Sequence, residues 1–359
     1  MNIAFQQPEY FKFVNNEFDA IVGIPIHLND DPEKLTEILR IYSMQNDISF
    51  LLSFVLNSTD RNDLSKVSGF RSKFIELEAT FPFLNISCTS QIFNDKNFSL
   101  FRKHSLKDPY DFLRLNYSHT FDFDNLFFVT SDSDVIDLPP DFLKRSKHNF
   151  NFRKNVDVIK GHPISQDVEN NYPTINAYLN MQNLYNLHKF KIHKSCTLQS
   201  SLIAIRANAM IRDSFPYAKN KMISETRPLI YSIQGRNKNS RILLLNPAIS
   251  YIDTPGDRYV HAFNSDIKFS DKKDTYSTKI DPTYTYTPFD KDRLESEISI
   301  FTKDDKVMKS IFEKHKFRAF DGKLVGHYDI LKMNQLDFLK EVFPKIKIKK
   351  PVVFNLDVK

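Results

Sequence analysis

The first half of the chain alternates short apolar runs with longer segments whose apolar residues recur every three or four positions. Four apolar runs have the length of strands and span residues 19–26, 48–56, 83–88 and 125–131. The segments between the first three runs place apolar residues on one helical face, at Leu35, Ile38, Leu39 and Tyr42 and at Val67, Phe70, Phe74 and Leu77. Residues 108–119 predict a further helix. This alternation predicts an α/β protein with a mainly parallel sheet flanked by helices.

The second half continues the alternation and then changes character. Strands are predicted at residues 156–160, 198–205 and 241–245, and helices at residues 172–188 and from Ser224. From about residue 265 the chain is first polar and rich in Thr and Tyr, then charged and helical in pattern. We therefore expect a ligand-binding α/β domain over residues 1–264 and a mostly helical C-terminal extension over residues 265–359.

The composition is that of a globular protein, since 41% of the 359 residues are hydrophobic. The first nine residues lack the basic start and apolar stretch of a signal peptide, and the longest apolar run, residues 48–56, is too short to span a bilayer. We therefore expect a soluble, cytoplasmic protein with no transmembrane segment. Cys88 and Cys196 lie among apolar and hydroxyl residues, which favours reduced core thiols over a disulfide or a metal site.

The sequence lacks the glycine-rich loop that commonly binds phosphate. Only 7 glycines occur, and neither the GxxxxGKS nor the GxGxxG pattern of a phosphate-binding loop is found. A metal ion and cationic side chains would have to hold the phosphate instead. The net charge of +6 permits an anionic partner. A nucleic-acid partner is allowed by the basic C-terminal third, which contains no recognisable nucleic-acid motif and carries Lys314, Lys316, Arg318, Lys345, Lys347, Lys349 and Lys350.

Asp132-Ser133-Asp134 follows the apolar run at 125–131 and precedes Leu138-Pro139-Pro140, which turns the chain away. Ligands bind at the carboxyl ends of the strands in an open α/β sheet. Two carboxylates one residue apart at such an edge form an oxygen-rich site suited to a divalent cation and its phosphate ligands. A solvated Asp-Ser-Asp turn is the alternative reading of the tripeptide alone.

Four segments occur in an order that is informative as a set. Ile24-Pro25-Ile26 ends the first strand, Asn57-Ser58-Thr59-Asp60 follows the second, and the Asp-x-Asp strand leads into Leu138-Pro139-Pro140-Asp141-Phe142-Leu143. Downstream, a predicted strand passes into a short helix between Ser200 and Met210. Together these segments resemble a GT-A fold glycosyltransferase over roughly residues 18–262. The similarity is to inverting family-2-like enzymes and equally to mannosylglycerate synthase.

The resemblance implies a hexosyl- or pentosyltransferase that moves a sugar from a nucleoside-diphosphate sugar to a hydroxyl acceptor. A saccharide or another small molecule is the expected acceptor, with protein or modified nucleic acid as alternatives. The resemblance also implies Mn²⁺ or Mg²⁺ held by Asp134, with Asp132 contacting the ribose or the metal through water. His261, in the loop after the last sheet strand, is the expected third metal ligand, and Asp253 is the second choice.

Glu225 falls where many inverting members carry an acidic pair, so the resemblance implies that it is the general base taking the acceptor's proton. The alternative is an ordinary acid in the first turn of a helix, where the helix dipole favours negative charge. Thr226 stands in place of the second acid, and Ser200 and Ser201 stand in place of the usual glycines. Inversion and retention of the anomeric configuration are therefore both open.

The remaining donor-site candidates are polar residues near the predicted strand ends. Asn57 and Asp60 would meet the base or ribose, with a capped turn as the alternative, and Arg102 and Arg114 would reach the diphosphate unless they are simply solvated. Two other functions stay open, a nucleotidyltransferase and a non-catalytic nucleotide-sugar-binding module. A nucleotidyltransferase usually has a Gly-rich, basic loop after its first strand, whereas residues 27–32 contain neither glycine nor a basic Lys or Arg.

Overall fold

The computed structural model describes residues 8–14, 17–93, 98–117, 122–181, 202–211 and 241–252, together with shorter pieces at 291–292, 294, 317–320, 323–326, 331–335, 337–338 and 353–355. Its strands are β1 (Tyr10–Lys12), β2 (Ala20–His27), β3 (Phe50–Ser58), β4 (Asn85–Ile92), β5 (Phe127–Thr130), β6 (Val135–Asp137), β7 (Val156–Ser165), β8 (Ile203–Arg206), β9 (Arg241–Ile252), β10 (Phe317–Phe320), β11 (Lys323–Gly326) and β12 (Val353–Asn355). Its helices are α1 (Lys34–Ser43), the 3₁₀ helix η1 (Arg61–Lys66), α2 (Val67–Leu77), α3 (Phe98–Asn116), α4 (Phe142–Phe152), α5 (Gln166–Asn171) and α7 (Ala207–Ile211).

One sheet organises most of the described strands. They lie in the order β1-β4-β3-β2-β5-β8-β7-β9-β12, and β6 pairs with β9. Strands β4, β3, β2 and β5 are parallel, whereas β1 and β8 run antiparallel to their neighbours. All nine residues of β3 are buried, which explains why this strand is a continuous apolar run rather than an alternating one. The predicted α/β class with a mainly parallel sheet is confirmed.

The order of the strands reverses direction beside β2. The chain passes from β2 outward to β3 and β4, and then returns to form β5 on the other side of β2. In doubly wound sheets, the crevice beyond the carboxyl ends of the strands at such a switch point is the usual place for a ligand. A ligand is therefore expected beyond the carboxyl ends of β2, β3 and β5.

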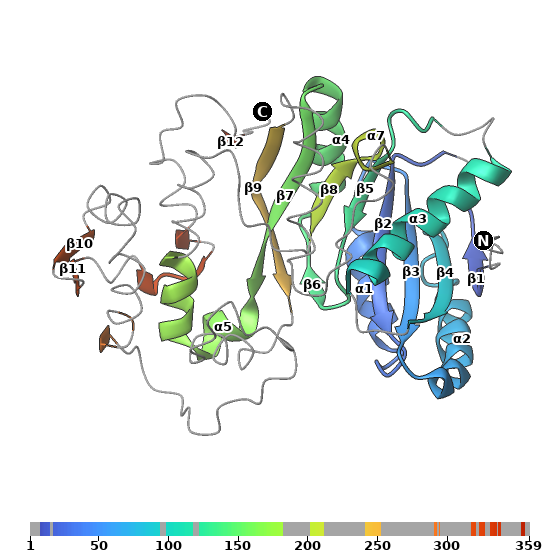
Figure 1. Ribbon diagram of the computed structural model, residues 1–359, viewed down its shortest axis with the longest axis horizontal. Helices are drawn as coiled ribbons and strands as arrows, with labels where there is room; N and C mark the ends of the chain where they lie inside the picture. Colours follow the sequence, from blue (N-terminus) through green and yellow to red (C-terminus); the bar gives the residue numbers. More distant parts are fainter. Residues whose placement is uncertain are drawn as a thin grey trace. The chain divides into compact units, whose positions relative to one another are not determined.

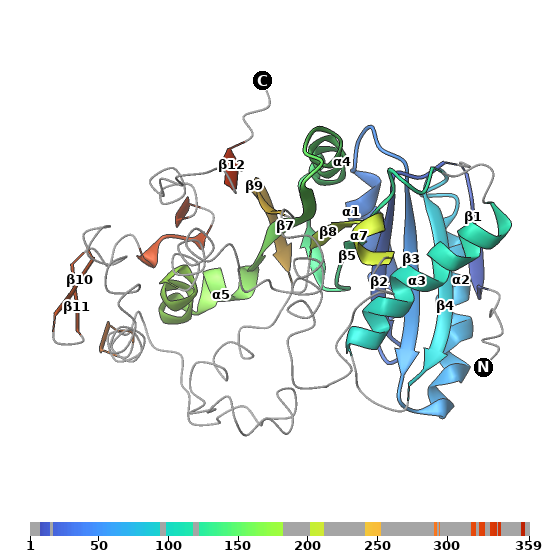
Figure 2. The same ribbon diagram turned by 45° about the horizontal axis from the view of Figure 1, so that its top comes forward.

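Helices cover both faces of this part of the sheet (Figures 1 and 2). Helix α3 crosses one face over β2 and β3, and α1 and α2 lie on the other face. Helix α4 adjoins α1, because the side chain of Gln45, just after α1, accepts a hydrogen bond from the backbone N–H of Leu143 at 3.1 Å. The core between the layers is rich in aromatic residues, including Tyr42, Phe54 and Phe74.

Gly23 is the position where α3 approaches β2 most closely. A Cβ atom there would collide with Ser105 Oγ and would lie 2.7 Å from Leu106 Cδ2. Gly23→Ala is therefore expected to lower the free energy of unfolding by about 1–3 kcal/mol, as overpacked cores do. Chemical denaturation followed by far-ultraviolet circular dichroism measures this change.

Gly69 provides the matched control. It lies in α2, and a Cβ atom there would meet only Pro32 Cγ at 3.8 Å, an ordinary contact. Gly69→Ala is expected to raise the free energy of unfolding by about 0.5–1 kcal/mol, because alanine loses less backbone entropy than glycine in a helix. Equal effects of the two substitutions would contradict close packing at Gly23.

The predicted elements of the first half are found with shifted ends. The first four strands appear as β2, β3, β4 and β5, and the helical faces at Leu35 and Val67 become α1 and α2. Helix α3 begins ten residues before the predicted start at residue 108 and carries Pro109 in its interior. Proline interrupts the usual helical pattern, so the pattern predicted a helix only from the residue before Pro109 onward.

Later predictions are met only in part by the described residues. The predicted helix at 172–188 is helical at residues 173–181, and the rest of it lies outside the described residues, as does the segment from Ser224. Burial raises the pKa of the Cys88 thiol, as expected of a core cysteine, while Cys196 is not among the described residues. Within the described part of the chain, no helix combines the length and apolar character needed to cross a membrane.

Contacts divide the chain into two compact units. The first comprises residues 1–163, 198–250 and 353–359, and the second comprises residues 164–197 and 251–352. The sequence placed a single boundary between residues 264 and 265, whereas this division assigns residues 164–197 to the second unit. Inside that unit, Asn176 and Asn180 each donate a side-chain hydrogen bond to the carbonyl of Met333 at 2.8 Å, which ties segments far apart in the sequence.

Candidate functional site

The Asp-x-Asp tripeptide lies at the carboxyl end of β5, beside the switch point. The backbone N–H of Ser131 donates to the carbonyl of Gly23 at 3.0 Å, which fixes the end of β5 against β2. The chain then turns into β6, and both Asp132 and Asp134 are partly buried in this turn. The structure therefore places the two carboxylates where the sequence predicted them.

Arg102 is the nearest described cation to this turn. It extends from α3, its residue is only 4% exposed, and its Nη2 forms an ion pair with Asp132 Oδ1. The side chain of Asp132 remains 28% exposed. Sequence reasoning directed Arg102 to a diphosphate, whereas the structure pairs it with a carboxylate of the chain itself.

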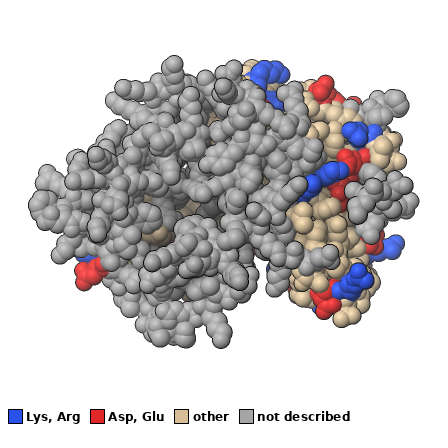
Figure 3. Space-filling model, in the orientation of Figure 1, with Lys and Arg blue, Asp and Glu red and all other residues tan. Residues whose placement is uncertain are grey.

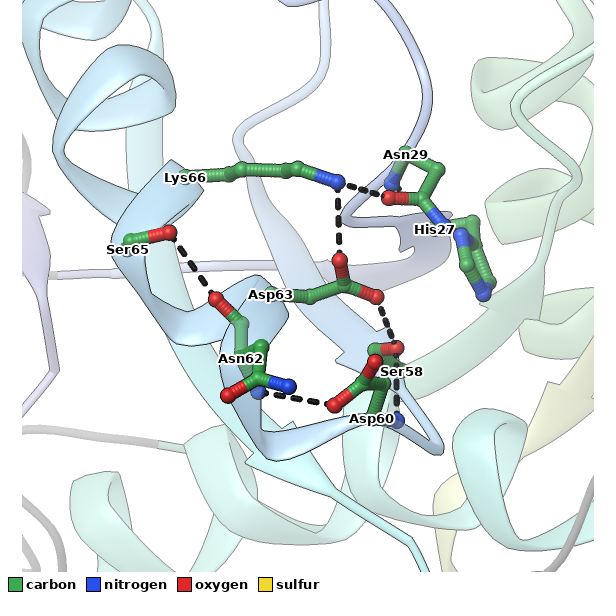
Figure 4. Close-up of polar contacts among 8 residues, drawn as sticks. All are labelled: His27, Asn29, Ser58, Asp60, Asn62, Asp63, Ser65 and Lys66. Atoms are coloured by element: carbon green, nitrogen blue, oxygen red, sulfur yellow. Dashed lines mark hydrogen bonds and ion pairs between the residues drawn. The ribbon is translucent and has the colours of Figure 1, made fainter.

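A second polar cluster occupies the ends of β2 and β3 (Figure 4). Asp63 in η1 accepts a hydrogen bond from Ser58 Oγ at 2.5 Å and pairs with Lys66 Nζ at 2.7 Å. Lys66 also donates to the side-chain oxygen of Asn29, so it bridges the loop after β2 to η1. Lys66 first, and then Ser58, hold the pKa of the Asp63 carboxyl below its usual value. This cluster fixes the shape of the edge beside the Asp-x-Asp turn.

His27 also lies at this edge, and it is not among the candidate site residues predicted from the sequence. It ends β2, opposite Asn57 of β3, and is partly buried. Its Nδ1 accepts a hydrogen bond from the backbone N–H of Asn29 at 3.1 Å, so the neutral ring carries its proton on Nε2. In Figure 4 the ring is turned away from Lys66. No motif marks His27 in the sequence, and its place at the end of the first predicted strand was the only available signal.

Asn57 and Asp60 already make contacts within the chain. Asn57 is buried and its side-chain N–H groups donate to the carbonyls of Ile26 at 2.8 Å and Val55 at 3.3 Å. Asp60 caps η1, because its Oδ1 accepts from the backbone N–H of Asn62 at 2.9 Å, and the residue itself is exposed. A contact of either residue with a base or ribose stays a prediction, and Asp60 is the more accessible of the two.

Arg114 is not brought to the Asp-x-Asp turn. It lies on α3 twelve residues after Arg102, a separation of about 18 Å along a helix. Its neighbour Tyr110 packs on the ring of Phe123, which precedes the amino end of β5. Arg114 therefore lies toward the opposite edge of the sheet from the predicted diphosphate position.

The other predicted residues lie outside the described part of the chain. They are Glu225, the predicted base, His261, the predicted third metal ligand, and its alternative Asp253. Among the described residues, no group of three or more His, Cys, Asp or Glu side chains is arranged to hold a metal ion. Asp132 and Asp134 supply carboxylate oxygens, the donor type that Mg²⁺ and Mn²⁺ prefer.

Charges of both signs are mixed on the described part of the face drawn in Figure 3. Lys and Arg side chains lie beside Asp and Glu side chains there. Within α3, Lys107 pairs with Asp111, and His104 Nδ1 lies 3.0 Å from Asp108 Oδ2. Of the basic C-terminal residues, only Arg318 belongs to a described element, β10.

Comparisons with known proteins give matches in structure alone. No family model matches the sequence, and no curated protein matches it. A mannosyltransferase from Pyrobaculum calidifontis in complex with GDP-Man and Mn²⁺ is 15% identical over 72% of this chain, with a TM-score of 0.43, and this chain spans 61% of its length. Glucosyl-3-phosphoglycerate synthase from Mycobacterium tuberculosis with Mg²⁺ and UDP is 12% identical, covering 68% of this chain and 75% of its own, with a TM-score of 0.39.

A third match is TarS residues 1–349 from S. aureus, which is 15% identical, covers 86% of this chain and 96% of its own, and has a TM-score of 0.38. The TM-scores of these three structures lie between 0.38 and 0.43, and the resemblance of this chain to glycosyltransferases stays a prediction from its sequence. The ligands named are those of the compared proteins.

Proposed function

We propose that this chain is a glycosyltransferase that uses a nucleoside-diphosphate sugar and a divalent metal ion to glycosylate a hydroxyl acceptor. The observation that carries the proposal is the position of Asp132 and Asp134, partly buried at the carboxyl end of β5 and at the switch point of the sheet. A solvated surface turn needs neither this place in the topology nor the buried Arg102 that pairs with Asp132. We propose a cytoplasmic localisation for this enzyme.

The residues present fit a divalent cation. Asp134 would hold Mn²⁺ or Mg²⁺ directly, and Asp132 would contact the ribose or the metal through water. His261 would complete the set of protein ligands. When bound, such an ion neutralises charge that develops on a departing diphosphate. The two carboxylates would hold and orient the ion, and the sequence contains no glycine-rich phosphate-loop pattern that could hold the diphosphate instead.

The nucleoside end of the donor would lie along the ends of β2 and β3. His27 presents an Nε2–H donor and Asp60 an exposed carboxylate at this edge, while Lys66 joins η1 to the loop after β2 through its hydrogen bond to Asn29. Glu225 would take the proton of the acceptor hydroxyl. Hexosyl or pentosyl specificity, and a saccharide or small-molecule acceptor, belong to the same proposal.

Two other functions are less well supported. A nucleotidyltransferase needs a loop after β2 that cradles a triphosphate, whereas here that loop is a tight turn in which the N–H of Asp30 donates to the carbonyl of His27 at 2.9 Å. A non-catalytic nucleotide-sugar-binding module would share the whole donor site. Only turnover separates that module from the enzyme.

The test is a set of nucleotide sugars, including GDP-mannose and UDP-glucose, each added with Mn²⁺, Mg²⁺ or EDTA. We expect one donor to raise the melting temperature only with metal, since a ligand at 100 times its Kd stabilises a protein by about 2.7 kcal/mol. The same donor is expected to be hydrolysed slowly without an acceptor. Turnover of a sugar 1-phosphate with a nucleoside triphosphate would instead identify a nucleotidyltransferase, and binding without any turnover would identify a binding module.

A further inference from the structure

We propose that Arg102 is a positioning residue that holds Asp132 in place for the ligand and does not itself contact the diphosphate. This inference rests on the proposed function, and it assigns Arg102 a role that differs from the one its charge suggested. Its basis is the ion pair between Arg102 Nη2 and Asp132 Oδ1, formed between α3 and the turn after β5.

The two elements that carry the pair, β5 and α3, both contact β2 at Gly23. The end of β5 is attached to β2, because Ser131 N–H donates to the Gly23 carbonyl at 3.0 Å. Helix α3 is packed onto the same residue through Ser105 and Leu106, which leave no room for a Cβ atom. Ser105 Oγ also donates to the Arg102 carbonyl at 2.9 Å. The backbones that carry Arg102 and Asp132 are therefore set against one common point.

Burial explains why the guanidinium is directed to this carboxylate. Arg102 is 4% exposed, and next to it in the helix Phe101 packs into a core cluster with Val55 and Phe93. A buried charge is strongly destabilising unless an opposite charge accompanies it, and loss of the partner leaves that charge uncompensated. Asp132 supplies the compensation while keeping 28% of its side chain exposed toward solvent. The Asp132 side chain thus contacts α3 through Arg102 and is also partly exposed at the carboxyl end of β5.

The consequence is a division of labour in the Asp-x-Asp turn. Asp132 has a carboxylate oxygen engaged by Arg102 and a fixed orientation, whereas Asp134 is the residue assigned to the metal. Supporting residues of this kind, which orient a ligand-binding side chain, typically change metal affinity by roughly 10- to 100-fold when removed. Because Arg102 acts through Asp132, substituting Arg102 should cause no further loss of binding affinity once Asp132 has been replaced.

A double-mutant cycle tests this directly. The variants are Arg102→Met, Asp132→Asn and the double variant, and the probes are GDP and UDP with Mn²⁺, measured by calorimetry, and Mn²⁺ alone, measured by electron paramagnetic resonance. We expect each single substitution to weaken binding by roughly 10- to 100-fold, and the double variant to bind no more weakly than the weaker single one. Losses that multiply would show that Arg102 contacts the ligand itself, and unchanged binding in Arg102→Met would remove its role altogether.

Arg206 supplies the matched control. It is another ion-paired arginine, partly buried, with its Nε 3.6 Å from Asp157 Oδ1, and it is in register with Phe127 at the amino end of β5, the opposite edge from Asp132. Arg206→Met is expected to lower the melting temperature and to leave the affinity for Mn²⁺ and nucleotide unchanged. An equal loss of affinity in Arg206→Met would mean that Arg102→Met acts only through general destabilisation.

Arg102→Lys keeps the test decisive if Arg102→Met does not fold. Lysine retains the charge and loses the two-pronged geometry of the guanidinium, so we expect affinity between those of the wild type and Asp132→Asn. Wild-type affinity in Arg102→Lys would contradict a geometric role. If the wild type binds Mn²⁺ but no nucleotide, the proposed function fails while the cycle is still read with Mn²⁺. If it binds neither, both proposals fail.

Discussion

Asp134→Ala is expected to abolish Mn²⁺-dependent binding of the donor nucleotide while leaving the fold intact. Asp134 lies in the turn between β5 and β6 and is only partly buried, so it contributes little to the apolar core. A direct metal ligand has more effect than a supporting residue, so the loss should exceed the roughly 10- to 100-fold expected for Arg102→Met. Calorimetric titration of GDP or UDP with Mn²⁺ measures it, and circular dichroism verifies the fold.

Asp137→Ala is the control for Asp134→Ala, since Asp137 is an exposed carboxylate at the end of β6, three residues further on. It should bind donor and metal as the wild type does. Two outcomes would contradict the assignment of Asp134. One is equal loss in Asp137→Ala, which would point to a general effect of removing negative charge. The other is full transferase activity of the wild type in EDTA.

The location of the two carboxylates could be predicted because it depends on short stretches of sequence. A continuous apolar run before Asp132 specifies a buried strand, and a strand of that kind in an α/β pattern ends at the ligand edge. The same argument ended the second strand at residue 56, two residues before β3 ends at Ser58. Local pattern and sheet topology agree at these points.

Partners of charged side chains could not be predicted in the same way. Arg102 pairs with Asp132 across 30 positions of sequence, through a helix that is polar from Arg102 to Ser105 and whose interior contains Pro109. The bridge from Lys66 to Asn29 likewise joins two loops that only the register of β2 and β3 brings together. Periodicity tells which face of an element is buried, but it does not tell which polar groups on neighbouring elements meet.

The assignment of residues 164–197 to the second contact unit has no local signal in the sequence, for a related reason. Residues 164–197 begin with the last two residues of β7, and their pattern gives no sign that they belong with residues 251–352. The contacts that reveal this are long-range, such as the hydrogen bond from Asn180 to the carbonyl of Leu331 at 3.0 Å. Asn180 is an unremarkable polar residue in the sequence, and its burial is a property of the folded unit alone.

Glu225→Gln is expected to lower turnover by roughly 100- to 10,000-fold with little change in donor affinity, because positioned proton transfer is worth about that much. The amide keeps the size of the side chain but cannot accept the proton of the acceptor hydroxyl. Single-turnover kinetics with saturating donor, beside calorimetric titration of the nucleotide, separate the chemical step from binding. Glu225→Asp is the matched variant: it keeps the base, displaces it by one methylene, and should retain part of the turnover.

The anomeric configuration of the product, compared with that of the donor, tells whether the reaction inverts or retains configuration. If Glu225 is the base of an inverting reaction, nuclear magnetic resonance will show a product of opposite configuration to the donor, and Glu225→Gln will be nearly inactive. A retained configuration with near-normal turnover in Glu225→Gln would assign Glu225 to the first turn of a helix, with the leaving diphosphate accepting the proton. An inverted product from an active Glu225→Gln enzyme would mean that another carboxylate is the base, and Asp213 and Asp253 would be replaced next.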